Sequence, residues 1–135
     1  MNLEVFGWLL SAPGQALLAE ALQGDLREGE RLRVLTHLRK HATAEQAAAA
    51  YDTAWLRQRA ATKFAHANQM YFTREALEQA SGERIAAYRA ERFAAYAHVG
   101  DFCCGIGGDA LGLAQRTHVY AVDLDPLRLA MAREN

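Results

Sequence analysis

Glycines and carboxylates gather in one short stretch near the end of this 135-residue chain. The segment 101–109 reads DFCCGIGGD, so an aspartate stands on each side of the glycines, and Asp123 follows on the next apolar run. Glycines at a turn let a ligand approach the backbone, because no Cβ atoms stand in its way. The flanking carboxylates disfavour a pyrophosphate and favour a ligand that carries positive charge. The segment therefore predicts a binding site for a nucleotide-like cofactor with a cationic group.

The glycine pattern alone leaves the cofactor open. Gly105-x-Gly107-x-x-Ala110 also satisfies the dinucleotide fingerprint GxGxxG/A, and Asp123 lies at the distance where an acid meets a ribose hydroxyl. A Rossmann fragment that binds NAD or FAD is therefore one alternative. The sulfonium and ammonium groups of S-adenosylmethionine suit a turn between two acids better, so we favour this cofactor on charge.

Three motifs together carry a resemblance to a known family. They are DFCCGIGGD at 101–109, VYAVDLDP at 119–126 and A-x-x-x-E-N at 130–135. This combination resembles the class I S-adenosylmethionine-dependent methyltransferases. Within them it is most similar to the RNA cap guanine-N2 methyltransferases of the trimethylguanosine synthase type and their bacterial relatives. The resemblance covers about the last third of the chain and implies a Rossmann-like fold, S-adenosylmethionine as cofactor and RNA as substrate.

The resemblance also implies roles for individual residues. Asp101 and the Gly105 backbone would hold the methionine ammonium, Asp123 would accept hydrogen bonds from both ribose hydroxyls, and Leu124 would lie against the adenine. Asp101, Asp109 and Thr73 also fit ordinary turn or helix caps, which need no ligand. Cys103 stands where the family has an aromatic residue, so the resemblance gives it no stacking role. The cofactor residues assigned in this way are Thr73, Asp101, Cys103, Gly105, Gly107, Asp109, Asp123 and Leu124.

The catalytic motif of such enzymes has no counterpart in residues 1–135. It reads Asn, Asp or Ser followed by Pro-Pro and an aromatic residue, whereas the two prolines here are Pro13 and Pro126. We therefore assign no catalytic residue. We expect a natural fragment, a truncated reading frame or part of a longer protein, and we expect this chain to be inactive in methyl transfer by itself.

The glycine turn must be positioned by a strand, a helix and a second strand. Apolar runs at 99–104 and 118–123 predict two parallel strands, and residues 110–114 between them have helical periodicity. The fold class expected is α/β, with an N-terminal helical region followed by the start of a Rossmann-like methyltransferase fold whose parallel sheet is incomplete. Two strands alone leave their outer edges unpaired, so we expect self-association through these edges.

Helices dominate the first half of the chain. We predict an opening apolar helix or turn, a helix over 12–22 capped by Ser11 and closed by Gly24, and a helix over 28–40. A capping box at 43–46 opens a long helix to about residue 66, and Thr73 and Gly82 mark two further helices before the glycine turn. The domains expected are therefore 1–66 and 67–135. A helical protein-interaction module with a non-catalytic appendage is the alternative function.

Composition restricts the function classes only weakly. The chain is 51% hydrophobic and 23% charged, with a net charge of −1, so an RNA site must be a local patch. Basic residues between 31 and 63 lie near Tyr51 and Trp55, although a solvated helix surface with core aromatics is the simpler interpretation. The adjacent cysteines, Cys103 and Cys104, are expected on a buried strand without a disulfide, and the five histidines are scattered without metal spacing. We find no membrane-spanning or signal segment and expect a cytoplasmic protein.

Overall fold

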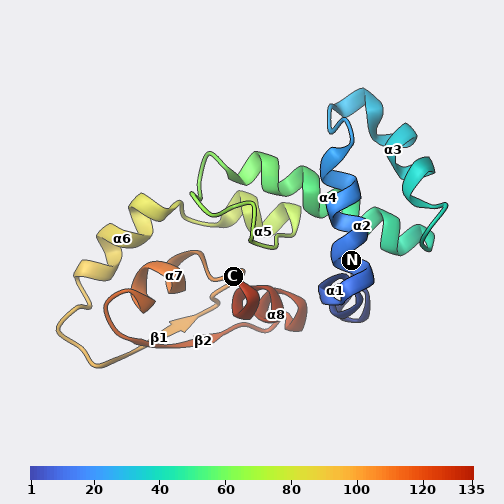
Figure 1. The fold of residues 1–135 in the computed structure, drawn as a ribbon. Coiled ribbons are helices and arrows are strands. Elements are labelled where there is room, and N and C mark those ends of the chain that lie inside the picture. The colour runs from blue at the N-terminus through green and yellow to red at the C-terminus, as the bar shows by residue number, and fades with distance from the viewer. The chain divides into compact units, whose positions relative to one another are not determined.

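The computed structural model describes residues 1–135, apart from the side chain of Glu28. The chain forms two compact units, Met1–Gln58 and Arg59–Asn135. The boundary that the sequence predicts, at residue 66, lies inside the second unit. The α-helices and the strands of both units are labelled in Figure 1.

The first unit is helical. It contains α1 (Leu3–Leu10), α2 (Ala12–Gln23), the short 3-10 helix η1 (Glu28–Glu30), α3 (Arg31–Leu38) and most of α4 (Ala44–Ala60). The predicted caps are confirmed: the Ser11 side chain accepts from the Gly14 amide at the start of α2, and Gly24 ends that helix. At the start of α4, Thr43 and Gln46 form the reciprocal capping box, with hydrogen bonds of 3.0 and 3.3 Å.

Two helices are shorter than the sequence predicts. The helix expected over 28–40 begins with η1 and continues as α3, and α4 ends at Ala60 instead of near residue 66. Beyond Ala60 the chain turns, which brings Phe64 against Phe72 with their ring centroids 5.8 Å apart. Both phenylalanines are buried, so burial of this pair outweighs the few further helical hydrogen bonds.

Apolar residues spaced along the helices build the core of the first unit. Phe6, Leu9, Leu18 and Leu38 are fully buried. Within the part of the chain that the structure describes, no single helix has both the length and the apolarity of a membrane span, although α1 and α2, bent by 85° relative to each other, meet both criteria as a pair.

The second unit contains the parallel strands that the sequence predicts. Its elements are α5 (Arg74–Gln79), α6 (Glu83–Glu91), β1 (His98–Phe102), α7 (Gly108–Ala114), β2 (His118–Val122) and α8 (Pro126–Glu134). The strands β1 and β2 pair in parallel, with His98 opposite His118 and Phe102 opposite Val122, and α7 connects them (Figure 1). The structure thus has the incomplete α/β architecture expected from the sequence.

The strand before the glycine turn ends earlier than predicted. β1 stops at Phe102, and Cys103 adopts a left-handed backbone with φ of 67°. This backbone turns the chain away from the strand direction, so Cys103 is exposed whereas Cys104 is buried. The prediction that both cysteines are buried strand residues is therefore wrong for Cys103, and for Cys104 only the burial is confirmed, because both residues follow the end of β1.

The helix after the turn packs closely on α6. A Cβ atom at Gly112 would lie 2.7 Å from the carbonyl carbon of Ala86 and 2.9 Å from its Cβ atom. Such a separation is shorter than van der Waals contact, so glycine at this position allows α6 and α7 to meet. This packing covers one side of the β1-α7-β2 unit.

The other face of the two strands is exposed. Phe102 is 78% exposed and Tyr120 is 57% exposed, and in residues 1–135 each strand pairs with only the other. The rings of His98, His118 and Tyr120 gather on this face, with centroids 5.0 to 5.9 Å apart. Two of the histidines that are scattered in sequence are therefore neighbours across the strands.

Candidate functional site

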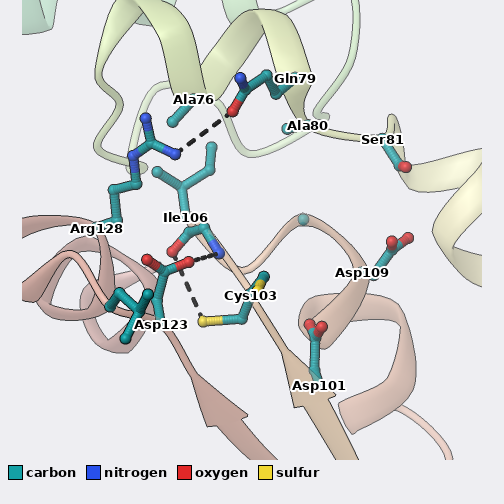
Figure 2. Close-up of a pocket in the computed structure, with 14 residues that line it drawn as sticks. Ala76, Gln79, Ala80, Ser81, Asp101, Cys103, Ile106, Asp109, Asp123 and Arg128 are labelled. Atoms are coloured by element: carbon teal, nitrogen blue, oxygen red, sulfur yellow. Dashed lines mark hydrogen bonds between the residues drawn. The ribbon is translucent and has the colours of Figure 1, made fainter.

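A cavity of about 340 Å³ lies at the carboxyl ends of β1 and β2, with the end of α5 forming its other wall (Figure 2). Its volume falls within the range of roughly 300 to 1,000 Å³ that is usual for small-molecule sites. The structure brings six of the eight predicted cofactor residues to this cavity. They are Asp101, Cys103, Gly105, Asp109, Asp123 and Leu124.

The two remaining predicted residues, Thr73 and Gly107, do not line the cavity. The Thr73 hydroxyl accepts a hydrogen bond from the Ala76 amide at 3.1 Å and so caps α5. Gly107 has a φ of 85° at the start of α7, and a Cβ atom there would lie 3.4 Å from the Cβ atom of Ala132. Both residues hold elements that surround the cavity.

The turn between β1 and α7 has an unusual backbone. Cys103 has a φ of 67° and Gly105 has a φ of 58°. Left-handed backbone at a residue with a side chain costs on the order of 1 to 3 kcal/mol, and such strain is concentrated at functional sites. A Cβ atom at Gly105 would meet nothing within 4 Å, so the backbone at this glycine is open to a ligand.

Asp123 connects the end of β2 to the glycine turn. Its Oδ2 atom accepts from the Gly105 amide at 2.8 Å (Figure 2). Its Oδ1 atom accepts from the Asp125 amide at 2.9 Å. These hydrogen bonds, first that from Asp125 and then that from Gly105, lower the pKa of Asp123, which keeps it ionised. Each carboxylate oxygen still has a lone pair for a ligand hydroxyl. The residue therefore both fixes the turn and remains able to bind a ligand.

Asp101 and Asp109 each bring a buried oxygen atom without a hydrogen-bond partner among the described residues. These atoms are Asp101 Oδ2 and Asp109 Oδ1. Burial raises the pKa of Asp101, and the negative charges of Asp109 and then Asp123 add to this effect, while a hydrogen bond from the Ala110 amide opposes it. A buried acceptor without a partner costs about 1 to 3 kcal/mol.

Two arginines near the site were not identified from the sequence. Arg89 on α6 donates to Asp109 Oδ2 at 2.6 Å. Arg128 on α8 lines the cavity, and its guanidinium reaches α5, where it donates to Glu75 Oε2 at 2.7 Å and to Gln79 Oε1 at 3.4 Å. Neither arginine belongs to a recognisable motif. The i,i+3 spacing between Asp125, the N-cap of α8, and Arg128 is the only sequence signal for either arginine.

The buried thiol in the turn, that of Cys104, is not a nucleophile near neutral pH. Burial raises the pKa of Cys104 to about 11, and the negative charges of Asp101 and Asp123 contribute to this shift. Only the thiolate form of cysteine reacts readily, so Cys104 stays protonated and inert near neutral pH. The carboxylates and the backbone groups of this cavity can bind a ligand, and the Cys104 thiol adds no nucleophile to them.

A larger cavity, of about 560 Å³, lies on the other side of Gly108. It is lined by residues of α6, α7 and the end of α8, together with the loop that contains His66. None of the eight predicted cofactor residues reaches it. We therefore take the cavity at the glycine turn, although it is smaller, as the candidate site.

Comparison with known proteins gives two matches of different kinds. Residues 2–60 match a family described as "Domain of unknown function (DUF8688)". The chain is also 40% identical, over 91 residues, to a protein from each of two strains of Mycobacterium tuberculosis, and both carry the name "Uncharacterized S-adenosylmethionine-dependent methyltransferase". The match covers 62% of this chain and 25% of each relative, so the chain spans about a quarter of the length of these curated relatives. No solved structure matches the chain.

Proposed function

We propose that this chain is the S-adenosylmethionine-binding portion of a methyltransferase. The observation that carries the proposal is the pair of unpartnered carboxylate oxygens, on Asp101 and Asp109, at a cavity that Asp123 also lines. The names of the two mycobacterial relatives support the same class of enzyme. The motif resemblance at the glycine turn also supports it.

The residues present fit this cofactor. The open backbone at Gly105 accommodates a ligand at the turn, and the Asp101 and Asp109 oxygens suit its ammonium group. Asp123 would accept from the ribose hydroxyls, and Leu124, which is 98% exposed, offers an apolar surface to the adenine. When bound, the cofactor supplies an activated methyl group on its sulfonium. The residues described here bind and orient it, and we assign none of them to catalysis.

A dinucleotide fits the same cavity less well. Its pyrophosphate would bring negative charge towards Asp101, whose carboxyl already has a raised pKa because of burial and neighbouring acids. Repulsion between like charges in a partly buried site costs more than it does in water. NAD and FAD therefore remain alternatives that the binding experiment below discriminates.

We further propose RNA as the class of methyl acceptor and the cytoplasm as the location. The motif resemblance supports RNA. The basic residues considered for an RNA surface add little support, because several of them have structural roles. Lys63 donates to the carbonyl oxygens of Leu77, Glu78 and Ala80 and so caps α5. Arg31 pairs with Asp52 and lies over the buried Tyr51 ring. The RNA contacts of such an enzyme would then lie largely outside these helices.

The alternative function, a non-catalytic interaction module, is favoured by one observation. The exposed face of β1 and β2 carries large apolar side chains, including Phe102 and Tyr120, and both strands have an open edge. Such surfaces mark places where another chain or segment packs. We propose self-association through these strand edges as a property of the isolated chain.

The test is an NMR titration of the ¹⁵N-labelled chain with S-adenosylmethionine, NAD and FAD in parallel. We expect S-adenosylmethionine to shift the amide signals of Gly105, Ile106 and Leu124, with an affinity in the high micromolar range or weaker. NAD and FAD should shift them less at equal concentration. Tighter binding of NAD or FAD would overturn the choice of cofactor, and no response to any of the three would favour the interaction module.

A further inference from the structure

Arg89 contacts residues of the candidate site without lining the cavity itself. The residue lies on α6 and does not line the cavity, but its Nη1 atom donates to Asp109 Oδ2 at 2.6 Å and to Ser81 Oγ at 2.7 Å. Both of these partners do line the cavity. Hydrogen bonds between ionised groups are shorter and about twice as strong as those between neutral groups, so the contact with Asp109 is of the stronger kind.

This contact fixes the orientation of the Asp109 carboxylate. A carboxylate is planar, so an oxygen that is held by an arginine determines where the other oxygen points. Oδ2 is engaged by Arg89, whereas Oδ1 is buried and has no hydrogen-bond partner among the described residues. Arg89 thus determines where Oδ1 lies for an incoming donor.

The same contact controls the charge of the cavity. The charges of Asp109 and Asp123 act on the Asp101 carboxyl, and those of Asp101 and Asp123 act on the protonated Cys104 thiol. Arg89 from α6 pairs with Asp109. The guanidinium of Arg128 on α8 is engaged with Glu75 and Gln79 on α5. Without Arg89, the Asp109 charge would lie uncompensated beside Asp101.

We propose that Arg89 is a positioning residue of the cofactor site, which orients Asp109 so that its Oδ1 atom accepts the cationic end of the ligand. This inference rests on the proposed function. Arg89 acts through Asp109 and does not touch the ligand. By compensating one of two neighbouring carboxylates, it also allows Asp101 to remain ionised at a lower pH.

The experiment compares Arg89→Met, Arg89→Lys and Arg84→Met. Methionine keeps much of the arginine stem and removes its charge, lysine keeps the charge, and Arg84 is an exposed arginine on the same helix. We expect Arg89→Met to weaken S-adenosylmethionine binding about tenfold at pH 7, since a charge-assisted contact is misplaced. Arg89→Lys should recover most of this loss, and Arg84→Met should bind like the parent chain. Circular dichroism of each variant checks that α6 is retained.

The pH profile distinguishes positioning from a merely structural role. Loss of Arg89 should raise the pKa of Asp101 further, because the Asp109 charge beside it is no longer compensated. As the pH falls, Arg89→Met should therefore lose binding of the cationic ligand at a higher pH than the parent chain. The midpoint of the curve of affinity against pH should lie about one pH unit or more higher. A uniform loss of affinity without a shifted midpoint would overturn the proposal.

The free chain separates this inference from the proposed function. The titration of the Asp101 carboxyl can be followed by ¹³C NMR without any ligand. An upward shift of its pKa in Arg89→Met, absent in Arg84→Met, would support control of the cavity charge by Arg89 even if the parent chain bound no S-adenosylmethionine. An unchanged Asp101 titration would overturn the inference, whatever the outcome of the ligand binding.

Discussion

The side-chain amide of Asn135 binds both backbone groups of Tyr71, a residue 64 positions earlier in the chain. Its Oδ1 atom accepts from the Tyr71 amide at 2.7 Å, and its Nδ2 atom donates to the Tyr71 carbonyl at 3.1 Å. Nδ2 also donates to the carbonyl of Ile106 in the glycine turn at 2.9 Å. One side chain after α8 therefore joins the segment before α5 to the turn.

We predict that Asn135→Ala destabilises the second unit by about 2 to 3 kcal/mol, because it removes the hydrogen bonds to the Tyr71 amide and to the carbonyls of Tyr71 and Ile106. Asn135→Asp keeps the acceptor for Tyr71 but loses the donor, so its effect at neutral pH should also be destabilising. Glu134→Ala, at an exposed neighbouring position, is the matched control and should change stability by less than about 0.5 kcal/mol. Urea unfolding measures the differences, and equal stability of Asn135→Ala and Glu134→Ala would contradict the prediction.

The sequence predicts the local elements of this chain well, where short-range signals determine them. Ser11, Thr43 and Thr73 each act as the helix caps that their spacing indicates. The order strand, turn, helix and strand around the glycines also follows from local hydrophobic periodicity and glycine placement. Element ends are less predictable, since burial of Phe64 against Phe72 decides where α4 stops.

The surroundings of the site depend on contacts that are distant in sequence. Arg89 and Asp109 are 20 residues apart, and Arg128 and Glu75 are 53 residues apart. No local pattern encodes such pairs, so the sequence identifies the carboxylates but not the arginines that orient and surround them. The left-handed backbone of Cys103 is equally hidden, because cysteine has no preference for that conformation.

Two glycines on helices provide a matched test of helix packing. Gly112→Ala on α7 should destabilise the chain by about 1 to 3 kcal/mol, because the added methyl group would lie 2.7 Å from the Ala86 carbonyl carbon. Gly7→Ala on α1 meets nothing within 4 Å and should stabilise its helix by about 0.5 to 1 kcal/mol. Thermal unfolding monitored by circular dichroism distinguishes the two. A neutral or stabilising effect of Gly112→Ala would show that α6 and α7 are less closely packed.

We expect Asp101→Asn to raise stability at pH 7 by about 1 kcal/mol while it abolishes the preference for a cationic ligand. The raised pKa of Asp101 means that its carboxyl binds a proton more readily in the folded state than in the unfolded state. Ionised Asp101 therefore destabilises the fold above its folded pKa, and this cost disappears as the pH falls through that pKa. The amide of asparagine is neutral at every pH and keeps an acceptor for the Ala110 amide. The unfolding free energies of the parent chain and of Asp101→Asn should differ at pH 7 and agree at pH 4.

Ionised Asp123 stabilises the fold, whereas ionised Asp101 destabilises it. Its pKa is lowered by the amides of Asp125 and Gly105, so its stabilising contribution is present above the unfolded pKa and is lost as the pH falls through the folded pKa. Asp123→Ala should reduce affinity for S-adenosylmethionine at least tenfold, corresponding to about 1.5 to 3 kcal/mol for a charge-assisted contact with the ribose. Asp25→Ala, at another aspartate with a lowered pKa but in the first unit, is the control. Unchanged affinity of Asp123→Ala by NMR titration would exclude the ribose role.

The isolated chain should self-associate and should not transfer methyl groups. Both β1 and β2 have one open edge within residues 1–135, and their exposed face carries Tyr120 beside His98 and His118. A lysine on such a strand opposes pairing with another chain, because pairing would bring positive charges together and remove them from water. Tyr120→Lys should therefore shift the chain towards monomer in light scattering. Tyr88→Lys, which replaces a 73% exposed tyrosine on α6, should leave the association unchanged. A monomeric parent chain, or catalytic turnover by it in a radiolabelled methyl-transfer assay, would contradict the corresponding half of this prediction.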